Sequence, residues 1–205
     1  MGKLNHANPN HPKKGSSIAV DPIRDEKHIK QIKRKLKKTS PRDYLLFVLG
    51  INNGLRIGDL LKIKVSDVNG LEVGQTVSII EQKTGKSNIL MINKAVYEAL
   101  SLYFDSVPLS EDDYLFKSRN KSVNGGSKPI TRETVAKMVK GWTKDIQGNY
   151  STHSLRKTWG YIQRTKFGVS FEIICRRFNH SSPRITMAYL GIKDSEINNV
   201  LLNEV

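Results

Sequence analysis

Apolar residues recur with a helical period over most of the chain, separated by short polar breaks. The clearest example begins at Ser40, a residue type suited to a helix N-cap, with Pro41 at the first helical position and Asp43 in the first turn. A long apolar run follows, and Gly54 is the expected end. A short helix is expected to begin in RIGDLLKI. Further helices are predicted over residues 25–38, 94–105, 131–145, 154–167, 170–178, 182–190 and 194–203.

Two segments depart from the helical pattern. TVSIIEQ (76–82) and SNILMIN (87–93) are rich in residues that favour β-strands, and they flank the turn sequence KTGK, which is typical of a hairpin. The sequence therefore predicts an α+β fold, a mostly helical single domain with a small antiparallel β-sheet. We expect this domain over residues 21–193, between a flexible basic N-terminal tail over 1–20 and a C-terminal helix over 194–205.

Positive charge is distributed unevenly along the chain, which has a net charge of +15. Residues 1–40 carry 11 basic and 3 acidic groups, and residues 114–193 carry 16 and 3, whereas residues 41–113 carry 7 and 10. Such segregation favours a surface that faces a polyanion, and double-stranded DNA is the first candidate.

Three observations bear on compartment and partners. No apolar run approaches the roughly 20 residues that cross a bilayer, so no membrane partner is expected. No N-terminal segment has the pattern of a secretion signal. The single Cys175 excludes an intramolecular disulfide and suits a reducing compartment. We expect a cytoplasmic protein associated with the nucleoid.

The segment THSLRKTW places His153 and Arg156 three residues apart, on one face of the predicted helix. Such a short spacing often arises by chance on a solvated surface, but an anion held between the two side chains, such as a phosphate, would also explain it. Four further candidates lie elsewhere in the chain: Arg56, Lys83, His180 and Tyr189. Each is ordinary when taken alone, so the information lies in their order.

Read along the chain, the candidates follow the order Arg, Lys, His-x-x-Arg, His, Tyr, which resembles that of the tyrosine recombinases, the phage integrase family. GLRIGDLLKIKVSDV is similar to the first arginine box of that family, HSLRKTW to its His-x-x-Arg box, and NHSSPRITMAY to its box with a histidine and the nucleophile. The resemblance covers about residues 21–195. It departs from the family pattern at Asn179, where Gly is usual, and in having only some 20 residues where members commonly have a separate core-binding domain.

The chemistry of strand cleavage explains several of these residue types. Breaking a phosphodiester bond without water or a metal needs a nucleophile on the protein, here Tyr189, which would form a covalent 3′-phosphotyrosine. Arg56 and Arg156 can each grip the charged transition state through paired donors. The leaving 5′-oxygen needs a proton, for which Lys83 is the candidate and Lys86 the rival. No cofactor is expected, because no Asp, Glu or His cluster has metal-ligand spacing.

The resemblance implies three further roles. His153 would take the tyrosine proton, His180 would donate a hydrogen bond to the phosphate, and Asp59 would support His153 by accepting a hydrogen bond. Tyr150, which borders the His-x-x-Arg box, is the alternative nucleophile. Basic residues near these segments are candidates for DNA contact: Lys86, Lys128, Arg132, Lys157 and Arg184.

The expected function is that of a site-specific recombinase of the integrase or resolvase type. We expect a monomer when free and a tetramer on DNA, with an accessory DNA-binding protein as a further partner to test for. The helix over 194–205 would either fold back on its own domain or pack into a neighbouring protomer, and both stay open. Two alternatives remain: a type IB topoisomerase-like nicking-closing enzyme, and a catalytically idle DNA-binding accessory protein of the same fold.

Overall fold

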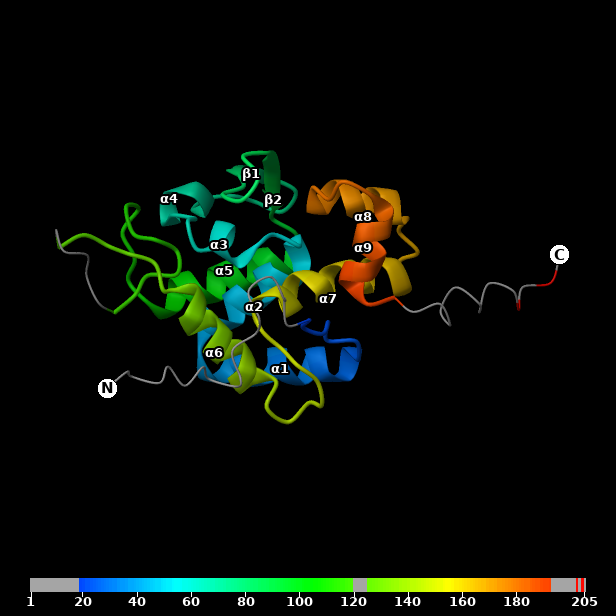
Figure 1. Ribbon diagram of the computed structural model, residues 1–205. Coiled ribbons are helices and arrows are strands. Elements are labelled where there is room, and N and C mark those ends of the chain that lie inside the picture. The colour runs from blue at the N-terminus through cyan, green and yellow to red at the C-terminus, as the bar shows by residue number, and fades with distance from the viewer. Residues whose placement is uncertain (1–18, 120–124, 193–201, 203, 205) are drawn as a thin grey trace, which may run out of the picture.

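The computed structural model describes residues 19–119, 125–192, 202 and 204 (Figure 1). The predicted tail over 1–20 and helix over 194–205 therefore lie almost wholly outside the described residues. The described elements are α1 (Glu26–Thr39), α2 (Pro41–Asn53), α3 (Ile57–Leu60), α4 (Val65–Val68), β1 (Thr76–Ile80), β2 (Ser87–Met91), α5 (Lys94–Ser106), α6 (Arg132–Trp142), α7 (Thr152–Thr165), α8 (Phe171–Phe178) and α9 (Pro183–Leu190). The predicted fold class, mostly helical with a two-stranded antiparallel sheet, is confirmed. None of the described helices is long and apolar enough to cross a membrane.

Helix boundaries follow the capping residues. Ser40 accepts a hydrogen bond from the Asp43 backbone N–H at the start of α2, and Gly54 ends that helix in the left-handed conformation, as predicted. Helix α7 begins two residues before its predicted start, because Ser151 and Ser154 form a reciprocal cap ahead of the His-x-x-Arg segment. The single turn α4 was not predicted.

Helix α2 lies at the centre of the main core. It packs against α5 and α7, and five successive residues, Leu45 to Leu49, are buried. A Cβ atom at Gly50 would overlap the Leu155 side chain, so glycine permits the close approach of α2 and α7. Because α2 leads into Arg56 and α7 carries His153 and Arg156, this tightly packed pair fixes two of the predicted catalytic segments relative to each other.

Helices α8 and α9 form a second, smaller core. Its buried residues are Ile174, Phe178 and Leu190, and Trp159 of α7 packs against them. The two helices lie at the side of the molecule remote from α4 and α6 (Figure 1). This satellite core carries the predicted nucleophile Tyr189.

The first described segment crosses α7 and reaches the end of α9. The Ile23 backbone N–H donates to the Thr158 hydroxyl at 2.8 Å, and the Arg24 guanidinium donates to the Gly191 carbonyl at 3.0 Å. Residues 20–24 thereby connect the main core to the satellite core.

Candidate active site

The hairpin brings a lysine to the edge of the site. Strands β1 and β2 pair in a register that sets Thr76 opposite Met91 and Ile80 opposite Ser87. The turn between them closes through a 3.0 Å hydrogen bond from the Glu81 N–H to the Lys86 carbonyl. Lys83 and Lys86 are both exposed on this turn.

An open pocket of about 500 Å³ collects side chains from four separate segments of the chain. Arg56 and Lys83 enter it from the end of α2 and from the hairpin turn, and His153 and Arg156 enter it from α7. The structure therefore brings four of the six predicted catalytic residues to one cavity. Lys86 is not among the residues that line the pocket. Of the two lysines predicted as proton donors to the leaving 5′-oxygen, this favours Lys83.

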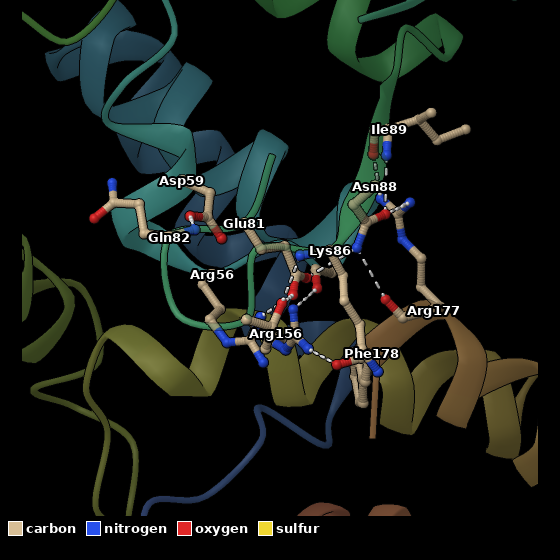
Figure 2. Close-up of polar contacts among 12 residues, drawn as sticks. Arg56, Asp59, Glu81, Gln82, Lys86, Asn88, Ile89, Arg156, Arg177 and Phe178 are labelled. Carbon is tan, nitrogen blue, oxygen red and sulfur yellow. Dashed lines mark hydrogen bonds and ion pairs between the residues drawn. The ribbon is translucent and has the colours of Figure 1, made fainter. Parts of the chain in front are cut away.

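Arg156 is buried and held by backbone carbonyl groups. Its two terminal nitrogens donate to the Gly54 carbonyl at 2.8 Å and to the Phe178 carbonyl at 2.7 Å. Burial lowers the pKa of Arg156 to about 10, so the guanidinium stays positive at neutral pH. Arg156 thus connects the end of α2 to the end of α8 while presenting positive charge to the pocket (Figure 2).

Tyr189 does not itself line the pocket but contacts His153, which does. The Tyr189 hydroxyl oxygen lies 3.2 Å from Nδ1 of His153. Burial lowers the pKa of His153, and the positive charge of Arg156 lowers it further, so the imidazole is neutral at pH 7 and can accept a proton. Burial raises the pKa of Tyr189 while Arg156 and Arg56 oppose the rise, so the resting phenol is protonated and needs a base.

His180 follows a residue in an uncommon conformation. Asn179 caps α8 with φ of 52°, the left-handed region in which glycine is most at ease and asparagine is tolerated better than most residues. This explains how Asn can stand where the family usually has Gly. Nδ1 of His180 lies 3.0 Å from the Thr186 hydroxyl, and burial, followed by the charge of Arg156, lowers the pKa of His180 to about 4. His180 is therefore a neutral imidazole beside Tyr189, with ring centroids 5.1 Å apart.

Asp59 lies at the site but not in the predicted role. The described structure contains no hydrogen bond between Asp59 and His153. Oδ1 of Asp59 instead accepts from the Gln82 backbone N–H at 3.0 Å, because the short helix α3 turns this buried carboxylate toward the hairpin. The predicted support of His153 is therefore corrected to an anchor for the hairpin.

Lys157 was predicted to contact DNA, but the structure turns its side chain away from solvent. The residue is only 8% exposed, and its Nζ donates to the Val20 carbonyl at 2.7 Å. Its position on α7 turns it toward the N-terminal segment, where Nζ lies 4.9 Å from the centroid of the Tyr189 ring. Lys157 packs against the ring of the predicted nucleophile Tyr189 rather than facing solvent.

The other predicted DNA contacts differ in their placement. Arg132 lines the pocket and donates to the Gln82 side chain at 3.1 Å. A Cβ atom at Gly58 would collide with the Arg132 guanidinium, so glycine makes room for it. Lys86 and Arg184 are exposed and Lys128 is half-buried, and none of these three lines the pocket.

Tyr150, the alternative nucleophile, is buried in the main core. Its hydroxyl donates to the Gln147 carbonyl at 2.9 Å, and it does not line the pocket. Tyr189, in contact with His153, is the better placed of the two tyrosines.

Sequence reasoning missed Glu81, a fully buried carboxylate two residues before Lys83. It pairs with the Arg56 guanidinium. The alternation of the strand offered a signal, because Val77 and Ile79 point inward and the next position of that period is 81. An acidic residue at an inward position needs a partner.

Metal-binding groups do not gather in the described part of the chain. No set of three His, Cys, Asp or Glu residues there could hold a metal ion. A metal-independent reaction stays a prediction.

Comparison with known proteins shows which family this chain is related to. The sequence model of the phage integrase family matches residues 24–196. A relative from Bacillus subtilis, "Probable integrase/recombinase YoeC", is 35% identical over 178 residues, which cover 85% of this chain and 91% of the relative. A "Tyrosine recombinase" from Pseudothermotoga lettingae is 30% identical over 76% of this chain and 51% of its own length. The chain likewise spans only about half the length of several other relatives.

Solved structures show the same fold. The crystal structure of XerA recombinase superimposes with a TM-score of 0.69 at 21% identity, covering 93% of this chain and 68% of that one. The order of the boxes along the chain, the pocket that brings together Arg56, His153 and Arg156, and the extent of the family match lead to one conclusion. This chain belongs to the phage integrase family and is a tyrosine-type site-specific recombinase.

Proposed function

We propose that this chain cleaves and rejoins one strand of duplex DNA at a time through a covalent 3′-phosphotyrosine at Tyr189. The observation that carries the proposal is the contact between the Tyr189 hydroxyl and His153, beside a pocket lined by Arg56 and Arg156. A nucleophile, a neutral base and two permanent cations are the groups that a phosphoryl transfer to tyrosine needs.

Each proton in the proposed step has a donor and an acceptor. The Tyr189 oxygen attacks the scissile phosphorus while its proton passes to Nδ1 of His153. The bond from phosphorus to the 5′-oxygen breaks, and Lys83 supplies the proton that this oxygen needs. Rejoining runs the same step in reverse, with a 5′-hydroxyl as the nucleophile and Tyr189 as the leaving group.

Three groups would stabilise the charge that develops on the non-bridging oxygens. Arg56 and Arg156 contribute charged donors, and the loss of one such donor typically costs about 3–4 kcal/mol in the barrier. If the Thr186 hydroxyl donates to Nδ1 of His180, then Nε2 carries the proton and can donate to the phosphate. The low pKa of His180 supports this neutral, donating role.

Duplex DNA is the proposed partner. Arg132 would contact the DNA backbone beside the scissile phosphate, and the exposed Lys86 and Arg184, with the half-buried Lys128, would make peripheral contacts. Lambda integrase, whose chain shares this fold with a TM-score of 0.57 at 17% identity, has been solved as a tetramer bound to a Holliday junction. We propose the same tetramer on DNA here, formed from free monomers in the cytoplasm at the nucleoid.

A duplex with a nick just beyond the cleavage position tests the proposal. Cleavage releases a short strand that carries the 5′-hydroxyl, and once this strand diffuses away rejoining is impossible and the covalent protein–DNA species accumulates. We expect a protein–DNA adduct that resists denaturation, and we expect equal yields in excess EDTA and in magnesium. Absence of any adduct on a panel of integrase-type sites would contradict the proposed chemistry and favour the idle accessory protein. Relaxation of supercoiled DNA that needs no specific site would instead favour the topoisomerase-like alternative.

A further inference from the structure

Glu81 places a negative charge inside a site that otherwise gathers positive charge. Its side chain is fully buried where the hairpin turn begins, two residues before Lys83. The Arg56 guanidinium pairs with Oε2 of Glu81 at 2.5 Å (Figure 2). Glu81 approaches the arginine from the hairpin. Because Arg56 also lines the pocket, the carboxylate holds the arginine from behind.

The carboxylate has hydrogen-bond donors at both oxygens. The Thr84 hydroxyl donates to Oε2 at 2.7 Å, and Nδ2 of Asn88 donates to Oε1 at 3.0 Å. Burial alone would raise the pKa of Glu81, but the hydrogen bonds from Thr84 and Asn88, with others, hold it at about 2. Glu81 is therefore charged throughout the neutral range, and its charge has directed partners.

Asn88 extends these contacts to α8. Its side-chain oxygen accepts from the Arg177 guanidinium at 2.6 Å, and its Nδ2 also donates to the Arg177 carbonyl at 3.2 Å. Arg177 in turn donates to the Asn53 carbonyl at the end of α2. Figure 2 shows this line of contacts from Arg56 through Glu81 and Asn88 to Arg177. The hairpin, the end of α2 and the end of α8 therefore share one polar network.

We propose that Glu81 is a positioning residue of strand cleavage, which orients Arg56 toward the scissile phosphate and fixes it to the hairpin that carries Lys83. A free arginine side chain samples many rotamers, and a clamp acts in the transition state only if it is already in place. Glu81 removes that freedom without touching the DNA. The inference rests on the proposed function, because the step that it serves is the attack of Tyr189.

Glu81→Gln tests the role, because glutamine keeps the shape but loses the charge that holds Arg56. We expect the single-turnover rate of adduct formation to fall about 10- to 100-fold, the scale of a catalytic group displaced by about 1 Å. DNA binding should change little. Glu72→Gln, which alters an exposed glutamate ahead of β1, is the matched control and should keep the wild-type rate.

A double-mutant cycle separates positioning from a purely structural role. If Glu81 acts through Arg56, Glu81→Gln should reduce the rate of an Arg56→Ala protein by no more than about twofold, because the group that it positions is already gone. Equal losses in both backgrounds would overturn the inference. If Glu81→Gln does not fold, Thr84→Val removes one of the donors to the carboxylate and should lower the rate several-fold; an unchanged rate would also overturn it. Failure of the wild-type protein to form any adduct would instead contradict the proposed function.

Discussion

Tyr189→Phe is expected to abolish the covalent protein–DNA adduct completely while leaving DNA affinity nearly unchanged. The substitution removes only the attacking oxygen, which lies 3.2 Å from Nδ1 of His153. The ring keeps its packing in the satellite core, where it meets Phe178 edge to face with centroids 5.5 Å apart. Gel analysis of the nicked duplex measures the adduct, and a filter-binding titration measures affinity.

Tyr150→Phe is the matched control, because Tyr150 was the other tyrosine that the sequence offered. Its hydroxyl donates a hydrogen bond to the Gln147 carbonyl and takes no part in the proposed step. This variant should therefore form the adduct at the wild-type rate, and the loss of the hydrogen bond should lower the free energy of unfolding by only about 1 kcal/mol. An adduct that survives Tyr189→Phe and disappears with Tyr150→Phe would reverse the assignment.

Arg156→Lys is expected to lower the rate of adduct formation about a thousandfold, the upper range for the loss of a charged donor at a developing oxyanion. One ammonium group cannot reach the Gly54 carbonyl, the Phe178 carbonyl and a phosphate together, as the planar guanidinium can. The charge is retained, so the effect isolates geometry from charge. Single-turnover cleavage at saturating protein measures it.

The control for this variant is Arg34→Lys, which alters an exposed arginine on α1 and should not change the rate. Thermal unfolding should accompany both measurements, because Arg156 also joins α2 to α8. A rate for Arg156→Lys within tenfold of wild type, in a folded protein, would show that the bidentate geometry is not needed.

Local signals in the sequence predicted most of the fold. Ser40, Pro41 and Gly54 act within a few residues of themselves, so the limits of α2 could be read directly. The same holds for the hairpin, whose strand residues and turn are adjacent in the chain. The predicted start of α7 was two residues late, because the reciprocal cap between Ser151 and Ser154 begins the helix at Thr152.

Contacts between distant segments were harder to predict. Five of the six proposed catalytic residues were found because they belong to a recognisable box, and Lys83 was found from its place in the hairpin turn. The proximity of the six could not be calculated. The roles of Asp59 and Lys157 were predicted from their residue types and their neighbours in the sequence. The directions in which their side chains point depend instead on contacts with Gln82 and Val20, which are far from them in the chain. Glu81 belongs to no box, and its partner Arg56 is 25 positions away.

The separation of the satellite core from the main core has a consequence for local stability. Opening α8 and α9 would expose three fully buried apolar residues and break a few polar contacts, whereas opening α2 would disrupt the whole main core. Regions with few buried contacts open at a lower free energy than the global unfolding. Backbone amides of α8 and α9 should therefore exchange with deuterium well before those of α2. Duplex DNA that engages Tyr189 should slow their exchange toward that of α2, and equal exchange of both regions without DNA would contradict this hierarchy.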